Sequence, residues 1–339
     1  MLRRTFLASL SSLWSPSLRA QFGERPPFRE LAEAAYSQQV IRAESRLVIV
    51  PVVVLDAGGA YVADLGAADF ELLDDGTPRT VRADTADTGV APISLIVAVQ
   101  RAAISAAVLA KVRKVGAMIQ PLITGERGEA AVIAFDEDLH LVQDFTSDPA
   151  AIADAFTRLT AGAQALTARM LDAVEMSGRM FAERKPDSRR VLLIVSESRD
   201  RGSRLKLDRA VQLVEQEGIV VYAATYSAYA TPFTAKPEDA PPLDSGPNLL
   251  GVFTELARNA KKMAARRLAA ETGGAQFSFL KQSGLERIIT ETGADLHSQY
   301  VLSFTPPNDA APGLHGIEVR VKGGEKYHVR ARRAYWVAE

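Results

Sequence analysis

The feature that constrains the fold most is a short apolar run, Ile93–Val99, which ends abruptly at the polar pair Gln100-Arg101. A β-branched run of this length, followed by a helix-permitting segment from Ala102, is typical of a buried strand that leads into a helix. In open α/β sheets, ligands bind outside the carboxyl ends of such strands. We therefore expect Gln100 to Ile104 to lie on the functional face of the chain, if it has one.

Two further apolar runs, Arg190–Val195 and Ile219–Tyr226, also predict buried strands, and Glu129–Phe135 with Leu139–Phe145 predicts a hairpin-like edge. Strands that alternate with helices imply a mainly parallel sheet with helices on both faces. We therefore predict a doubly wound α/β unit. Its helices are expected at residues 104–122, 150–159, 168–183, 207–216, 250–272 and 284–298.

Short β segments flank this unit on both sides. Strands are predicted at 47–55, 70–73 and 78–83 before it, and at 299–305, 316–321 and 327–333 after it. The first group spans only roughly 45 residues, too few for a sandwich core of its own, so it should recruit strands from the second group. The predicted organisation is an N-terminal Ig-like β segment at 44–90, an inserted α/β domain at 91–298, and a C-terminal β segment at 299–339 that packs with the first.

The N-terminal residues are typical of a secretory signal. The segment Arg3–Leu7 precedes a short apolar stretch that ends near Trp14, and small residues follow around Ala20. Arg3-Arg4-Thr5-Phe6-Leu7 also resembles a twin-arginine export motif. We predict a signal peptide at 1–20, a linker at 21–43, and export to the periplasm or beyond. No apolar stretch is long enough for a permanent membrane span.

Composition excludes several classes of function. The 339 residues include no cysteine, so disulfides, thiolate metal sites and a cysteine nucleophile are absent. The net charge of −1 gives no general attraction to nucleic acid. The four histidines are scattered, without metal-ligand spacing. We predict no cofactor and no nucleic-acid partner.

An ordered set of motifs covers nearly the whole chain after residue 43 and resembles bacterial von Willebrand factor A-related proteins of the type found in Acidobacteria. The resemblance implies a doubly wound A domain on a β-sandwich-like support. The residues that carry it are Val54-Leu55-Asp56 with Gly58-Gly59, Asp69-Phe70-Glu71 with Asp75-Gly76, Tyr300–Pro307, and Val329–Tyr335.

The resemblance also implies a place for a metal-ion-dependent adhesion site, in which an Asp-x-Ser-x-Ser loop, a Thr and an Asp hold the ion. These positions fall on Gln100, Ala102, Ile104, Thr167 and Glu197. Mg²⁺ requires hard oxygen ligands in near-octahedral geometry. The side chain of Gln100 offers only a neutral carbonyl oxygen, and the side chains of Ala102 and Ile104 offer no oxygen. We therefore predict that the site has degenerated and binds no metal; a rearranged site built from Glu197, Asp200 or Asp136 is the alternative.

The function we predict is an exported, non-enzymatic protein–protein interaction module with an unknown protein partner. The residues expected to bind that partner are Gln100, Arg101, Ala102, Ile104, Thr167, Glu197 and Arg199, with Arg201 at the rim. A metal-dependent adhesin with atypical ligands is one alternative. A hydrolase is another, but the serine-containing loop 196–201 lacks a G-x-S-x-G motif and a following histidine.

Three further charged groups are given structural interpretations. The turn Asp136–Asp138 is expected to be solvated, because it lacks the other ligands of a calcium loop. Asp172 and Glu175, near Arg169 and Arg179, predict surface charge pairs on a helix. The basic stretch 258–267 is interpreted as a solvated helix face, with binding of an acidic partner or of a phosphate-bearing surface as the alternative.

Overall fold

A computed structural model describes residues 47–84, 91–102, 106–162, 167–184, 188–197, 199–226, 264–279, 282–323 and 326–337. The predicted signal peptide and linker lie outside the described residues, as do Ile104 and the basic residues Arg258, Lys261 and Lys262. Residues 46–339 form one compact unit that contains both an α/β part and a β-sandwich.

The α/β part is built on a six-stranded sheet with the strand order β10-β9-β8-β5-β6-β7. All neighbouring pairs are parallel except β6 with β7, which form the expected antiparallel edge. The chain moves outward from β5 first to one side and then, from β8, to the other, which is a doubly wound arrangement. The strands are β5 (Ile93–Gln100), β6 (Glu129–Phe135), β7 (Leu139–Thr146), β8 (Arg189–Glu197), β9 (Val220–Tyr226) and β10 (Gln276–Ser278).

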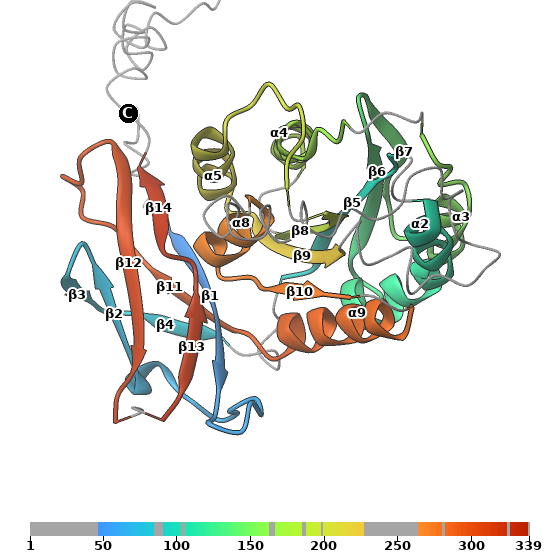
Figure 1. Cartoon of the computed structure of the whole chain (residues 1–339). Coiled ribbons are helices and arrows are strands. Elements are labelled where there is room, and N and C mark those ends of the chain that lie inside the picture. Colours follow the sequence, from blue (N-terminus) through green and yellow to red (C-terminus); the bar gives the residue numbers. More distant parts are fainter. Residues whose placement is uncertain are drawn as a thin grey trace, which may run out of the picture. The chain divides into compact units, whose positions relative to one another are not determined.

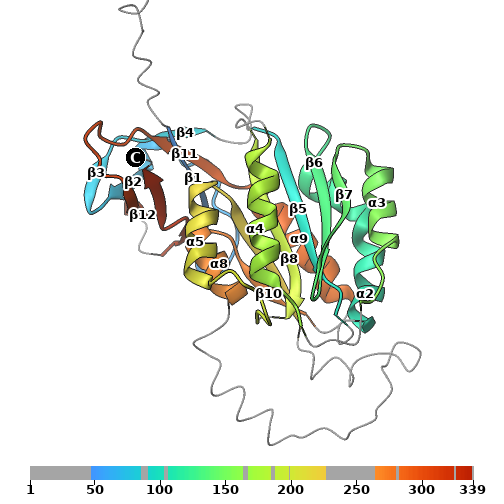
Figure 2. The same cartoon turned by 90° about the horizontal axis from the view of Figure 1, so that it is seen from above.

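Helices cover both faces of this sheet (Figures 1 and 2). Successive side chains of β5 point to opposite faces. Leu95 and Val97 enter the core beneath α2, α3 and α9, whereas Ile96 and Ala98 enter the core beneath α4, α5 and α8. The predicted fold class is thereby confirmed. The helices are α2 (Ala106–Val112), α3 (Pro149–Thr157), α4 (Met170–Ala182), α5 (Leu207–Gln216), α8 (Ala264–Thr272) and α9 (Gln282–His297).

The prediction of one continuous helix over residues 104–122 is wrong, because the described part of this segment is divided into three helical pieces. Helix α2 gives way to a 3₁₀ segment, η5 (Arg113–Met118), and then to a π-helical segment, η6 (Gln120–Thr124). Gly116 lies so close to Phe156 of α3 that a Cβ atom there would be 2.7 Å from the Phe156 Cβ. Pro121 cannot donate a backbone hydrogen bond, which favours the irregular turn that follows.

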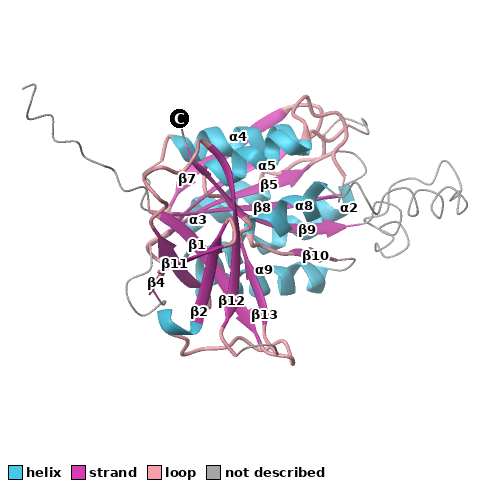
Figure 3. Ribbon diagram, turned by 90° about the vertical axis from the view of Figure 1, so that its left-hand side faces the viewer, coloured by secondary structure: helices cyan, strands magenta, loops and turns pink. Residues whose placement is uncertain are grey.

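The β-sandwich consists of two four-stranded antiparallel sheets, β13-β1-β11-β4 and β14-β12-β2-β3 (Figure 3). Its core contains Val50, Val52, Leu72, Leu302 and Phe304. The expected pairing of N-terminal with C-terminal strands is present, because β1 pairs with β11 and β13, and β2 pairs with β12. The strands are β1 (Val48–Leu55), β2 (Phe70–Asp74), β3 (Thr77–Arg79), β4 (Arg82–Asp84), β11 (Tyr300–Phe304), β12 (Gly313–Val321), β13 (His328–Ala331) and β14 (Ala334–Val337), with a 3₁₀ turn η2 (Ala67–Asp69) before β2.

Two predicted strands are each divided in the structure. The segment 78–83 forms the end of β3 and most of β4, and the segment 327–333 forms β13 and leads into β14. In both cases the two halves belong to different sheets, so the chain crosses between the layers at the break. The domain boundaries placed at residues 90/91 and 298/299 remain a prediction.

Arg332, at the break between β13 and β14, joins the sandwich to the α/β part. Its Nη2 lies 2.6 Å from Oε2 of Glu215 in α5, and its backbone forms a β-bridge with Thr272. Glu215 is almost fully buried. Burial raises the pKa of Glu215 to about 7, although the nearby Arg332 acts to lower it. The junction therefore contains a carboxyl group that titrates near neutrality.

This titration predicts a pH-dependent stability. A carboxyl whose pKa is raised on folding contributes stability below its ordinary pKa of 4.5 and loses it as the pH rises to about 7. The free energy of unfolding of the wild type, relative to Glu215→Gln, should fall over this interval by roughly 3 kcal/mol. Chemical unfolding of both proteins at intervals from pH 4 to 8 measures it. A difference that stays constant over that range would show that Glu215 does not titrate there.

Candidate functional site

The carboxyl ends of β5, β6 and β8 meet at one edge of the sheet. We use the name strand-end face for a set of described residues at these ends and in the loops beside them, including Thr167 of the loop that precedes α4. Its described members are Gln100, Arg101, Ala102, Asp136, Thr167, Glu197, Arg199 and Arg201. It contains every described residue that the sequence assigns to partner binding, together with Asp136 and Arg201.

Gln100 connects the ends of the two central strands. Its side chain is buried, and Oε1 accepts a hydrogen bond of 3.0 Å from the backbone N–H of Glu197. The same carbonyl oxygen is the only ligand atom that Gln100 can offer to a metal. Gln100 therefore acts in the described structure as a cross-link between β5 and β8.

Arg101 makes an ion pair with Asp136, the residue after β6. The Nε atom of Arg101 lies 2.9 Å from Oδ2 of Asp136, whose side chain is only 5% exposed. The other carboxylate oxygen accepts the backbone N–H of Asp138 at 2.9 Å, and His140 Nε2 lies 3.4 Å from it. The interpretation of Asp136 as part of a solvated turn is therefore wrong, because its carboxylate is buried and held by a cation.

Glu197 is held in a corresponding way on the other side. Its Oε2 lies 3.1 Å from Nη2 of Arg201, and the Glu197 side chain is 7% exposed. The backbone of Arg201 in turn pairs with Ala168 through hydrogen bonds in both directions, of 2.8 and 3.0 Å. Each buried carboxylate of the strand-end face thus has an arginine guanidinium beside it.

The remaining predicted residues differ in how much surface they present. Ala102 is fully buried, whereas Arg101, Thr167, Arg199 and Arg201 are partly exposed. Ile104 lies outside the described residues. The sequence identifies Gln100 as a polar residue at the end of a buried apolar run, and the same pattern could have identified Asp136. The pairing of Asp136 with Arg101, 35 positions away, leaves no pattern in the sequence.

A glycine permits the pairing of Arg101 with Asp136. The backbone N–H of Gly162 donates to the Arg101 carbonyl at 2.6 Å. A Cβ atom at this position would lie 1.9 Å from Oδ2 of Asp136 and 3.1 Å from Nε of Arg101. Only a residue without a side chain fits against the ion pair.

Asp172 corrects a second expectation. It does form an ion pair with Arg169, whose Nη2 lies 2.6 Å from Oδ2 of Asp172, but the Asp172 carboxylate is buried and not at the surface. Glu175 and Arg179 form the expected exposed pair, at 2.6 Å. Burial acts to raise the pKa of Asp172, but the backbone N–H groups of Leu205 and Arg204, together with Arg169, outweigh it and lower the pKa. The ionised carboxylate anchors the loop that follows β8.

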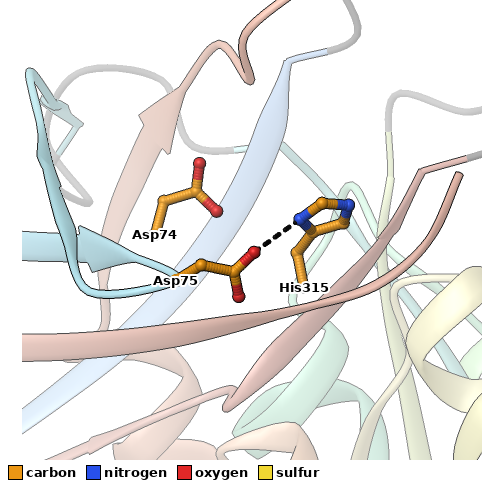
Figure 4. Close-up of side chains that lie close together, drawn as sticks. All are labelled: Asp74, Asp75 and His315. Carbon is orange, nitrogen blue, oxygen red and sulfur yellow. Dashed lines mark hydrogen bonds and ion pairs between the residues drawn. The ribbon is translucent and has the colours of Figure 1, made fainter. Parts of the chain in front are cut away.

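A second cluster, which the sequence did not single out, lies in the sandwich (Figure 4). Asp74, Asp75 and His315 place one potential metal-ligand atom each within 4.8 Å of one another. However, His315 Nδ1 lies 2.8 Å from Oδ2 of Asp75, and His315 Nε2 lies 2.7 Å from the Ala311 carbonyl oxygen. An acceptor on both sides of the imidazole favours its protonated form, which has no lone pair for a metal.

The two carboxylates of this cluster also accept hydrogen bonds from other groups of the protein. Asp74 accepts from Arg79 Nε at 2.9 Å and from the Tyr335 hydroxyl at 3.0 Å. Asp75 accepts the backbone N–H of Gly316 at 2.7 Å. The cluster is therefore better described as an ionic contact between β12 and the turn after β2 than as a metal centre.

No protein-family model matches the chain, and no curated protein matches it either. Several solved structures are similar to it. Von Willebrand factor type A from Catenulispora acidiphila has 11% identity and a TM-score of 0.44, over 88% of this chain and 76% of that one. BatB from Bacteroides thetaiotaomicron has 13% identity and a TM-score of 0.38, over 60% of this chain and 99% of that one.

A third similar structure is an aerotolerance-related membrane protein from Bacteroides fragilis, with 12% identity and a TM-score of 0.40 over 60% of this chain and 98% of that chain. At these identities a likeness concerns the fold alone, so we transfer no residue role from these proteins. The doubly wound sheet with helices on both faces is consistent with the von Willebrand factor A-like fold predicted from the sequence.

Replacing Gly162 by alanine should separate Arg101 from Asp136. The new methyl group would occupy the position of the carboxylate oxygen, so the pair would have to move and leave buried charge less well compensated. We expect the free energy of unfolding to fall by about 1–3 kcal/mol. Gly66→Ala is a matched control, because its Cβ would meet Asp69 only at an ordinary 3.7 Å. Equal stability of the two variants in urea would contradict the close approach.

The His315 contact predicts a second pH effect. The hydrogen bond to the Ala311 carbonyl and the contact with Asp75 raise the pKa of His315 above its ordinary value of 6.5. Its stabilisation is therefore complete below pH 6.5 and is lost as the pH rises through the raised pKa. Relative to His315→Gln, the wild type should lose stability over this alkaline interval in pH-dependent thermal unfolding. Stabilisation of the wild type by added Zn²⁺ would instead favour a metal centre.

Proposed function

We propose that this protein is an exported, non-enzymatic interaction module whose strand-end face binds a protein partner through side chains, without a bound metal. The observation that carries the proposal is the pairing of both buried carboxylates of that face with guanidinium groups. Arg101 lies against Asp136, and Arg201 lies against Glu197.

A divalent ion would have to displace these contacts. Mg²⁺ binds through carboxylate, carbonyl and water oxygens. The Gln100 carbonyl is engaged by the Glu197 backbone, and Asp200 accepts from the Ser203 hydroxyl at 2.5 Å and from the Leu171 N–H at 3.1 Å. An ion entering here would also lie close to two positive charges, which opposes its binding. The arginines thus compensate the buried charge that a cation would otherwise compensate.

The contact surface in this proposal is narrower than the set of residues named from the sequence. Gln100 and Ala102 are buried and would hold the loops in place rather than touch a partner. Arg101, with 23% of its side chain exposed, and Arg201, with 27%, would reach the partner together with Thr167 and Arg199. Arginine is enriched at protein interfaces because its planar head binds carboxylates and stacks on apolar surfaces. An acidic patch on the partner suits this face.

Two further observations support the proposal. The first is the charged and then apolar N-terminal sequence, which is typical of an exported protein; among the described helices, none has the length and apolar character needed to cross a membrane. The second concerns Ser196, a described serine at the carboxyl end of β8. Its hydroxyl is buried and donates to the Glu197 carbonyl at 2.6 Å, with Met170 as its other neighbour, an arrangement that does not activate a nucleophile.

Charge reversal at the rim tests the proposal. The full chain, attached to beads, is used to capture partners from the native cell envelope, with Mg²⁺ or with EDTA in parallel. Arg199→Glu should reduce recovery of the partner by about tenfold, because a repulsive contact replaces an attractive one. Arg320→Glu, at an exposed position of β12, is the matched control and should have no effect.

Three outcomes separate this proposal from its alternatives. Recovery that is equal in Mg²⁺ and EDTA supports binding without a metal. Recovery that EDTA abolishes and Mg²⁺ restores would overturn that part and favour the metal-dependent adhesin. Recovery that is unchanged in Arg199→Glu would show that the partner binds elsewhere on the chain.

A further inference from the structure

A cavity of about 380 Å³ lies at the opposite ends of the parallel strands from the strand-end face. Ile93 and Arg189, near the beginnings of β5 and β8, form part of its wall. The wall also includes Ala91 and Pro92, which lead into β5, and Leu296, His297 and Gln299, which lie at the end of α9 and just before β11. Both connections between the sandwich and the α/β part therefore pass beside this cavity.

Arg189 is the central polar group of the wall. Its Nε donates to the Ala91 carbonyl at 3.3 Å, and its Nη1 donates to the Leu296 carbonyl at 2.8 Å. The Nη1 atom also lies 3.5 Å from Oε1 of Gln299. All three acceptors are neutral, and no carboxylate of the described residues lies within ion-pair distance of Arg189. Its second terminal nitrogen, Nη2, makes no hydrogen bond within the described chain.

Within the described part of the chain, the positive charge of Arg189 therefore has no carboxylate partner. Burial lowers the pKa of Arg189 to about 10, which still leaves the guanidinium charged at neutral pH. A charge removed from water without a counter-charge is unfavourable. An anion in the cavity would supply the missing partner.

The other polar groups of the wall extend this positive character. Arg127 and His297 lie at the exposed rim, and Thr124 places a buried hydroxyl-bearing side chain in the wall. Glu126, also at the exposed rim, is the one acidic residue among those lining the cavity. Two arginines against one glutamate leave the lining with a net positive charge.

We propose that this cavity binds a small organic anion that carries one carboxylate or phosphate group, with the partly buried Arg189 as its counter-charge. A planar guanidinium carries its N–H groups in a fixed fork that matches oxyanions, and that of Arg189 is already held by two backbone carbonyl groups, which limits the loss of conformational freedom on binding. The volume falls within the range usual for small-molecule sites. A ligand here would contact both connections at once and would stabilise the junction. This site is independent of the function proposed for the strand-end face.

The first test compares probes that differ in charge alone. Benzoate and benzamide have nearly the same shape, and inorganic phosphate tests the other oxyanion class. Binding to the ¹⁵N-labelled full chain is followed through the amide signals of Gly125 and Gln299. We expect benzoate or phosphate to bind about tenfold more tightly than benzamide, since only the anions can pair with the guanidinium of Arg189. Whichever of benzoate and phosphate binds more tightly shows whether the ligand group is a carboxylate or a phosphate. Equal binding of benzoate and benzamide, with no binding of phosphate, would overturn the proposal.

The second test uses variants. Arg189→Lys removes the planar fork and should weaken anion binding by about tenfold, and Arg127→Ala should weaken it by about threefold. Arg320→Ala, on the distant strand β12, should leave the affinity unchanged. If Arg189→Lys does not fold, the affinity of Arg127→Ala and the comparison of benzoate with benzamide still test the proposal. Unchanged affinity in the folded Arg127 and Arg189 variants would overturn the proposal.

Discussion

The pairing of β4 with β11 is the constraint on which the rest of the architecture depends. The chain leaves the sandwich after β4 and returns to it at β11, and these two strands are hydrogen-bonded neighbours, with Ala83 opposite Leu302. Everything between them must therefore begin and end at nearly the same place. A doubly wound sheet satisfies this requirement, because its first strand is central and its last helix, α9, returns beneath the sheet to the side where β5 begins. Arg189 contacts both connections at that point.

The sequence predicted the parts of the fold that depend on local pattern. Strands buried on both faces are nearly continuous apolar runs, and the helix at 207–216 has strong amphipathic periodicity, so its predicted bounds agree with α5. What could not be predicted depends on distant partners. The crossing of the chain from β13 to β14 is set by the contact of Arg332 with Glu215, more than a hundred residues away. The break after α2 reflects the packing of Gly116 on Phe156.

The candidate site shows the same limit at the level of single residues. The sequence identified the positions after β5 and β8 and the absence of oxygen ligands there. It did not reveal that Asp136 and Glu197 are buried, because burial of a carboxylate depends on a cation that other loops provide. Nor did it reveal why residue 162 is a glycine, because the reason is the close approach of its backbone to the Asp136 carboxylate. Residue type was therefore predictable, whereas the pairing of charges required the structure.

The closure of the sandwich by strands from both ends of the described chain has a mechanical consequence. A pulling force applied across β1 and β14 would be carried first by the hydrogen-bonded sheets of the sandwich. The chain enters and leaves the α/β part through the adjacent strands β4 and β11, so the backbone of that part lies outside the path of the load while their pairing holds. The contacts of Arg332 with Glu215 and Thr272 are the second attachment, at the break between β13 and β14. A binding face on the α/β part would keep its shape under tension until the pairing of the sandwich strands or the Arg332 contacts rupture.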